Sequence, residues 1–99
     1  MEIRKTRDGN RLAVALVGKL DTITSQQLEK ELHASMDGVT ELEIDLAGLN
    51  YITSAGLRVL SMAQKVMNRQ GHLSVIHTQP DVMEVFEVTG LTDIMEISQ

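Results

Sequence analysis

The hydrophobic period of this chain changes from that of a strand to that of a helix within Leu42–Met67, and this change constrains the fold more than any other feature. Over Glu41–Leu46, apolar and acidic residues alternate strictly, which predicts a strand with one face against a core. Apolar residues then recur at helical spacing, which predicts a helix from Ser54 or Ala55 to Asn68. A strand followed at once by a helix is typical of an α/β protein.

A short turn, Asn50–Gly56, connects this strand to this helix and contains Ser54. Serine is a favoured N-cap residue, and the first backbone N–H groups of a helix have no acceptor within the helix. We therefore expect Ser54 to be the N-cap. A negative charge on its hydroxyl would meet the positive end of the helix dipole, and Arg58, one turn further on, could contact a phosphate there. These features suit a phosphoserine, although most N-cap serines only cap their helix.

The other strands are expected on both sides of this unit. Glu2–Arg7 and Arg11–Val17 predict a hairpin around the turn Asp8–Asn10. His72–His77 predicts a short strand after the long helix. Because the links in this strand–helix–strand segment are short, we expect His72–His77 to run parallel to Glu41–Leu46.

Capping residues mark the expected ends of the other helices. Thr24–Gln27 has the composition of a capping box with Thr24 as the N-cap, and the helix that follows should stop before Gly38. Pro80 suits the first turn of a third helix, which Gly90 would end.

Three smaller expectations complete the prediction of secondary structure. Ile23 and Leu28 are placed to form a hydrophobic staple at the start of the first helix. Gly71 stands where a left-handed C-cap of the second helix belongs. Ile94–Ile97 should form either an edge strand or a terminal helical turn.

The composition allows a single aliphatic core. With 99 residues and 42% apolar content, the chain is expected to form one domain, residues 1–99. Its two aromatic residues are Tyr51 and Phe86, and six methionines can fill gaps between the aliphatic side chains. The residues expected in the core lie in the inward phase of their elements: Leu28, Leu32, Ile44, Leu46, Leu60, Ala63, Val75 and Phe86.

Several classes of function are excluded by what the sequence contains. The formal charge of −5 argues against non-specific nucleic-acid binding, and no cysteine is present to form a disulfide or a thiolate metal site. His33, His72 and His77 do not have the spacing of a zinc site, and Thr53–Gly56 lacks the first glycine of a nucleophile elbow. We therefore expect no enzyme activity, no cofactor and no metal. No apolar run approaches membrane-spanning length, and the expectation is a cytoplasmic protein without membrane insertion.

Three groups of residues resemble landmarks of the STAS domain, the family of bacterial anti-sigma factor antagonists. The first is the turn of Gly18, Leu20 and Asp21; the second is Ser54, Ala55, Gly56 and Leu57; the third is Pro80, Phe86, Thr89, Gly90 and Leu91. They occur in the family's order and cover almost the whole chain. The resemblance implies an α/β fold with a small mixed sheet of four to five strands and helices packed mainly on one face.

The resemblance also implies a mechanism. In this family the unphosphorylated antagonist binds an anti-sigma factor that is also a serine kinase, and thereby releases the sigma factor. The kinase phosphorylates the serine at the helix start, which is Ser54 here, and a phosphatase of the PP2C type restores it. The sequence departs from the family pattern at Thr53, which replaces an aspartate and is a second candidate acceptor.

The implied partner-binding surface surrounds this serine. Its expected residues are Asp21, Thr22, Thr53, Ser54, Ala55, Gly56, Arg58 and Met62. The family also contains interaction subunits that are not switched by phosphorylation, for example in transport complexes or sensory assemblies. Such a subunit would use the same helix face, so phosphorylation of Ser54 distinguishes the two alternatives.

Overall fold

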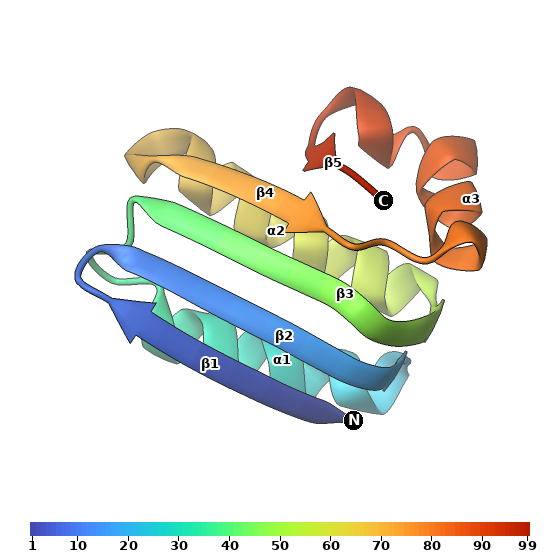
Figure 1. Cartoon of the computed structure of the whole chain (residues 1–99), viewed down its shortest axis with the longest axis horizontal. Helices are drawn as coiled ribbons and strands as arrows, with labels where there is room; N and C mark the ends of the chain where they lie inside the picture. Colours follow the sequence, from blue (N-terminus) through green and yellow to red (C-terminus); the bar gives the residue numbers. More distant parts are fainter.

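A five-stranded mixed sheet with three helices forms the structure, a computed structural model that describes all residues from Met1 to Gln99 (Figure 1). The elements in chain order are β1 (Glu2–Asp8), β2 (Arg11–Leu20), α1 (Thr22–Ser35), β3 (Glu41–Ile52), α2 (Ser54–Gln70), β4 (His72–Ile76), α3 (Pro80–Thr89), the 3₁₀ turn η1 (Leu91–Asp93) and β5 (Glu96–Ile97). The strand order is β1-β2-β3-β4-β5, with β1 antiparallel to β2 and every other pair parallel. The predicted hairpin, the parallel β3–β4 pair and the fold class are confirmed.

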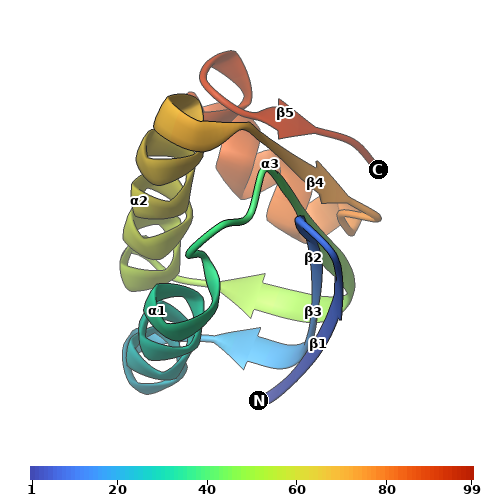
Figure 2. The same ribbon diagram turned by 90° about the vertical axis from the view of Figure 1, so that its left-hand side faces the viewer.

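The helices α1 and α2 pack side by side on one face of the sheet, and no helix covers the opposite face (Figures 1 and 2). Each follows a parallel strand directly, so the first turns of both helices lie at the carboxyl end of the strands. The third helix, α3, stands beyond the end of β4, where it packs against the last part of β3. This end of the sheet therefore gathers the starts of all three helices.

The core lies between the sheet and the helices and is aliphatic, as the composition predicts. Every residue expected in the core is buried: Leu28, Leu32, Ile44, Leu46, Leu60, Ala63, Val75 and Phe86. Leu60 is fully buried, which confirms the helical phase of α2. Phe86 fills the space beneath α3 and is likewise fully buried.

The strand β3 is six residues longer than the prediction of Glu41–Leu46, because it continues to Ile52. The pairing of β2 with β3 shifts register twice in this region, and the irregularity breaks the period of two on which the prediction depended. Gly48 permits the first shift, since a Cβ there would lie 3.0 Å from the Val17 side chain. The expected turn from Asn50 was therefore wrong for its first three residues, which belong to the strand.

The first helix begins three residues before the expected position. Its N-cap is Asp21, not Thr24: one Asp21 carboxylate oxygen accepts hydrogen bonds from the amides of Ile23 (3.0 Å) and Thr24 (2.9 Å). Thr24 forms the other half of this capping box, because its hydroxyl accepts the Asp21 amide at 2.8 Å. The predicted staple was also wrong, since Ile23 is 78% exposed.

The two helix-ending glycines have different roles. Gly90 ends α3 as predicted, and it adopts a left-handed conformation with φ 77°. Gly71 has φ 174°, which is extended backbone, so the expected left-handed cap was wrong there. A Cβ on Gly71 would lie 1.9 Å from the Thr40 carbonyl oxygen, and glycine is needed for this close approach.

At the C-terminus, the edge-strand alternative is confirmed by the pairing of β5 with β4.

Candidate functional site

Ser54 is the first residue of α2, and Thr53 is its N-cap. Only Thr53 separates β3 from α2, and its backbone is extended (φ −109°, ψ 176°). The prediction that Ser54 is the N-cap was wrong by one residue. The strand β3 continues to Ile52, whose side chain is buried in the core, and the next residue, Thr53, is the N-cap. The serine hydroxyl is nevertheless presented at the start of the helix, as expected.

The Thr53 side chain does not cap the helix that it precedes. Its hydroxyl donates to the Leu20 carbonyl oxygen at 3.3 Å, and its amide donates to the same oxygen at 3.0 Å. No side chain accepts a hydrogen bond from the leading amides of α2. The positive end of this 17-residue helix is therefore not neutralised by any group of the protein.

Gly56 fixes the position of this first turn against the end of β2. A Cβ at Gly56 would lie 2.8 Å from two atoms of the Leu20 side chain and 2.9 Å from Ile52. Only glycine lets α2 start this close to the two strand ends. Gly56 is buried, so it positions the first turn of α2 but does not form part of the exposed surface around Ser54.

Arg58 is the cationic residue of α2 that lies nearest to Ser54 along the helix. Ser54 and Arg58 are both exposed, and the helix contains three cationic residues and no acidic one. Arg58 takes part in none of the five salt bridges of the protein, so its guanidinium is available one turn after Ser54. Met62 is less exposed than expected, because it packs against the core.

The start of α1 lies at the same end of the sheet and has the opposite electrostatic character. Hydrogen bonds from the Thr24 amide, the Thr24 hydroxyl and the Ile23 amide lower the pKa of Asp21, so its carboxyl stays ionised. The amides of α1 are therefore satisfied by a side chain, whereas those of α2 are not. Of the two expected contact residues here, Thr22 is exposed and Asp21 is half-buried.

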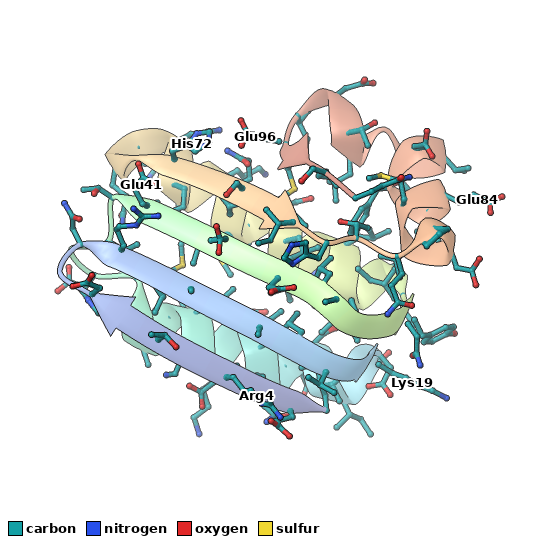
Figure 3. The ribbon with its side chains drawn as sticks, viewed as in Figure 1. Arg4, Lys19, Glu41, His72, Glu84 and Glu96 are labelled. Atoms are coloured by element: carbon teal, nitrogen blue, oxygen red, sulfur yellow. The ribbon has the colours of Figure 1, made fainter.

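Sequence reasoning missed Tyr51 and Lys19, which lie beside this site. The Tyr51 side chain is 51% exposed, and the Lys19 ammonium lies 6.0 Å from the centre of its ring. Figure 3 shows Lys19 at the end of the molecule where β2 and β3 finish. The sequence contained one indication that Tyr51 belongs to the site: it is one of two aromatic residues and lies within the segment that precedes Ser54.

Each of the three histidines has a different acidic neighbour. His33 approaches Glu29 at 4.0 Å, His72 approaches Glu96 at 3.3 Å, and His77 approaches Asp45 at 3.1 Å. No group of three or more potential metal ligands is brought together. None of the helices combines the length and the apolar composition that crossing a bilayer requires.

Comparison with known proteins gives a match over most of the chain. The family model described as "Mlab, STAS domain" matches residues 3–96. A Bordetella bronchiseptica protein named as an anti-sigma factor antagonist, BtrV, is 35% identical over 99% of this chain and 86% of its own length. The anti-sigma-B factor antagonist of Listeria monocytogenes is 32% identical over 94% of this chain and 83% of its own length.

Solved structures of antagonists have the same fold. An anti-sigma factor antagonist from Mycobacterium paratuberculosis superposes with a TM-score of 0.88 at 21% identity, covering 98% of this chain and 84% of that one. The unphosphorylated form of SpoIIAA gives 0.86 at 18% identity, covering 99% and 89%. The phosphorylated form of the Bacillus SpoIIAA gives 0.77 at 17% identity, covering 99% and 92%. At these identities the likeness concerns the fold.

Proposed function

Because this chain belongs to the STAS domain family, we propose that it acts as an anti-sigma factor antagonist that is switched by phosphorylation of Ser54. Its relatives in Bordetella and Listeria are named as such antagonists. In the proposed cycle, the unphosphorylated chain binds an anti-sigma factor that is also a serine kinase, and the sigma factor is released. A phosphatase of the PP2C type removes the phosphate.

The observation that carries this proposal is an exposed serine hydroxyl at the start of a helix whose leading amides have no side-chain acceptor. A phosphate on Ser54 would bring about −1.5 to −2 charge to this position at neutral pH. It would meet backbone N–H donors and the positive end of the helix dipole. Arg58 is placed to add a charge-assisted hydrogen bond.

Thr53 is the less suitable acceptor of the two neighbouring hydroxyls. It is half-buried, and its hydroxyl donates to the Leu20 carbonyl oxygen, whereas the Ser54 hydroxyl has no hydrogen-bond partner in the protein. A kinase would have to break the contact with Leu20 to reach Thr53.

The partner surface is proposed to include Ser54 itself, because a kinase must reach the hydroxyl that it modifies. We expect this surface to include Thr22, Arg58 and the exposed part of Met62. Charge reversal in Arg58→Glu should weaken binding of the anti-sigma factor while leaving the melting temperature unchanged within about 2 °C, since Arg58 is exposed and unpaired. An unchanged dissociation constant would place the partner elsewhere on the chain.

Phosphopeptide mapping tests the assignment directly. The chain is incubated with ATP and a serine-kinase anti-sigma factor, and the modified residue is identified by mass spectrometry. Phosphate is expected on Ser54 in the parent and in Thr53→Val, and on neither residue in Ser54→Ala. Phosphate on Thr53 alone would contradict the choice of acceptor.

The second candidate is a STAS interaction subunit that is not switched. The observation that favours it is Thr53 at the position where the family pattern has an aspartate. This candidate predicts stable partner binding and no phosphate on Ser54 or Thr53 in the same experiment. Its partner would be a component of a transport complex or a sensory assembly.

A further inference from the structure

A groove opens beside Ser54 because β3 is longer than its neighbour β4. The two strands pair only from Glu41↔His72 to Asp45↔Ile76, so the last part of β3 projects beyond β4. His77 then adopts a left-handed conformation (φ 57°) and turns the chain toward α3. Gln79 holds α3 against the projecting strand, since its side-chain amide donates to the Ala47 carbonyl oxygen at 2.6 Å. The groove lies between residues of α3 and residues at the end of β3. Figure 1 shows α3 beside this end of β3.

The lining of the groove is apolar with a polar rim. Four apolar residues form most of it, and the full set is Asn50, Tyr51, Ile52, Asp81, Val82 and Val85. Its volume is about 220 Å³. Small-molecule sites usually enclose about 300–1,000 Å³. The groove is thus better suited to one side chain of a protein than to a free ligand.

Tyr51 is the aromatic residue of the groove, and packing within the protein does not account for its exposed position. Of the two aromatic residues in the chain, Phe86 is fully buried, whereas Tyr51 is 51% exposed. Its hydroxyl makes no hydrogen bond within the protein, and one of its few neighbours is the Lys19 ammonium at 6.0 Å. Exposed tyrosines beside apolar clefts are frequent among the residues that contribute most to protein–protein binding.

The charge at the rim indicates what should lie next to an inserted side chain. Asp81 is exposed and takes part in none of the salt bridges of the protein. Glu84 and Glu87 follow on the same helix, which contains no cationic residue, and Figure 3 shows Glu84 projecting from this end. An apolar side chain that enters the groove would be best accompanied by a lysine or arginine close to Asp81.

From this geometry we propose that the groove binds an apolar side chain of the anti-sigma factor, flanked by a cationic residue of the same partner. The inference rests on the proposed function, because the groove lies close to Ser54 along the chain: Tyr51 lines it and precedes Ser54 by three residues at the junction of β3 and α2. The groove would then contribute to the affinity of the unphosphorylated chain for the partner, and phosphorylation of the nearby serine would still weaken the complex.

Two groove variants and one matched control test this proposal. Tyr51→Ala and Val85→Asp each remove the apolar contact, whereas Val88→Asp changes the same residue type on α3 at a position that is 81% exposed and outside the groove. Binding is measured by calorimetry with the purified anti-sigma factor that phosphorylates the parent chain, after thermal melts have shown that each variant is folded. The groove variants should bind at least ~10-fold more weakly. Val88→Asp should bind like the parent.

The outcomes separate the two proposals. If the parent is bound and phosphorylated while folded Tyr51→Ala and Val85→Asp keep its dissociation constant, the groove proposal is overturned and the proposed function stands. If the groove variants change self-association in sedimentation and leave anti-sigma factor binding intact, the occupant is a second copy and the proposal is likewise overturned. If the parent itself neither binds nor is phosphorylated, the proposed function fails and the groove proposal falls with it.

Discussion

Asp21 caps the start of α1, and the hydrogen bonds that its carboxylate accepts favour the ionised form. Hydrogen bonds from the Thr24 amide, then the Thr24 hydroxyl, lower the pKa of Asp21 below its usual 3.8. A lowered folded-state pKa means that the ionised group stabilises the fold above the unfolded-state pKa, and that this stabilisation is lost as pH falls through the folded-state value.

The variant Asp21→Asn isolates this contribution, because asparagine can still cap the helix but carries no charge. At pH 7 the variant should melt at a lower temperature than the parent. The difference should begin to shrink near pH 4, where the Asp21 carboxyl of the unfolded chain becomes protonated, and should be lost as the pH falls through the lower folded-state pKa. Thermal melts of both proteins between pH 7 and pH 2.5 measure it. A difference that stays constant over this range would show that the Asp21 charge is not responsible.

At the residue scale, the sequence predicted that capping residues start both helices but not which residue is the cap. Thr24 and Ser54 are both good N-cap residues, and the structure uses Asp21 and Thr53. The choice depends on where the preceding strand ends, which is decided by tertiary packing. Local propensity cannot determine this.

At the element scale, the start of α2 depends on the absence of a side chain at Gly56. Replacing glycine by alanine inside a helix normally stabilises it by about 0.5–1 kcal/mol. Here the added Cβ would lie 2.8 Å from Leu20, so Gly56→Ala should instead destabilise the protein by about 1–3 kcal/mol. Lys65→Ala, at an exposed position of the same helix whose side chain makes no hydrogen bond or ion pair within the protein, is the control and should be neutral or slightly stabilising. Chemical denaturation compares the two variants, and a Gly56→Ala protein as stable as the control would contradict the close packing.

The elements whose hydrophobic period is regular were predicted well, and the irregular ones were not. The period of α2 placed Leu60 and Ala63 correctly in the core. The second half of β3 was missed because its buried residues, Leu49 and Ile52, are three apart, which breaks the period of two expected of a strand. The groove could not be predicted for the same reason, since it exists only because β3 projects beyond β4.

At the scale of the whole molecule, charge is distributed unevenly around the binding end. The helix α2 contains three cationic residues and no acidic one, whereas residues 72–99 contain five acidic residues and no lysine or arginine. A partner at this end would therefore meet Arg58 of α2 together with the acidic residues of α3, whereas Lys65 and Arg69 lie toward the other end of α2. Composition alone gave only the net charge of −5, because the separation of the charges depends on the fold.

This arrangement predicts that phosphorylation blocks the interface without refolding the protein. A charge at an exposed helix N-terminus stabilises by about 0.3–1 kcal/mol, so the isolated domain should tolerate a phosphate on Ser54. In the complex, the same phosphate would be desolvated or would face a surface shaped for a neutral hydroxyl, at a cost of about 2–5 kcal/mol. Even the low end of this range weakens binding by roughly 30-fold.

The variants Ser54→Asp and Ser54→Ala separate blocking from refolding. Ser54→Asp should lose most of its affinity for the anti-sigma factor while melting within about 5 °C of the parent, because a carboxylate at the first position of α2 is favourable to the helix. Ser54→Ala should bind like the parent and should not be released when ATP is added. Calorimetric titration and thermal melts of the same preparations measure both properties. Loss of affinity together with a large drop in melting temperature would instead mean that the switch acts by unfolding the start of α2, and normal binding by Ser54→Asp would favour the subunit that is not switched.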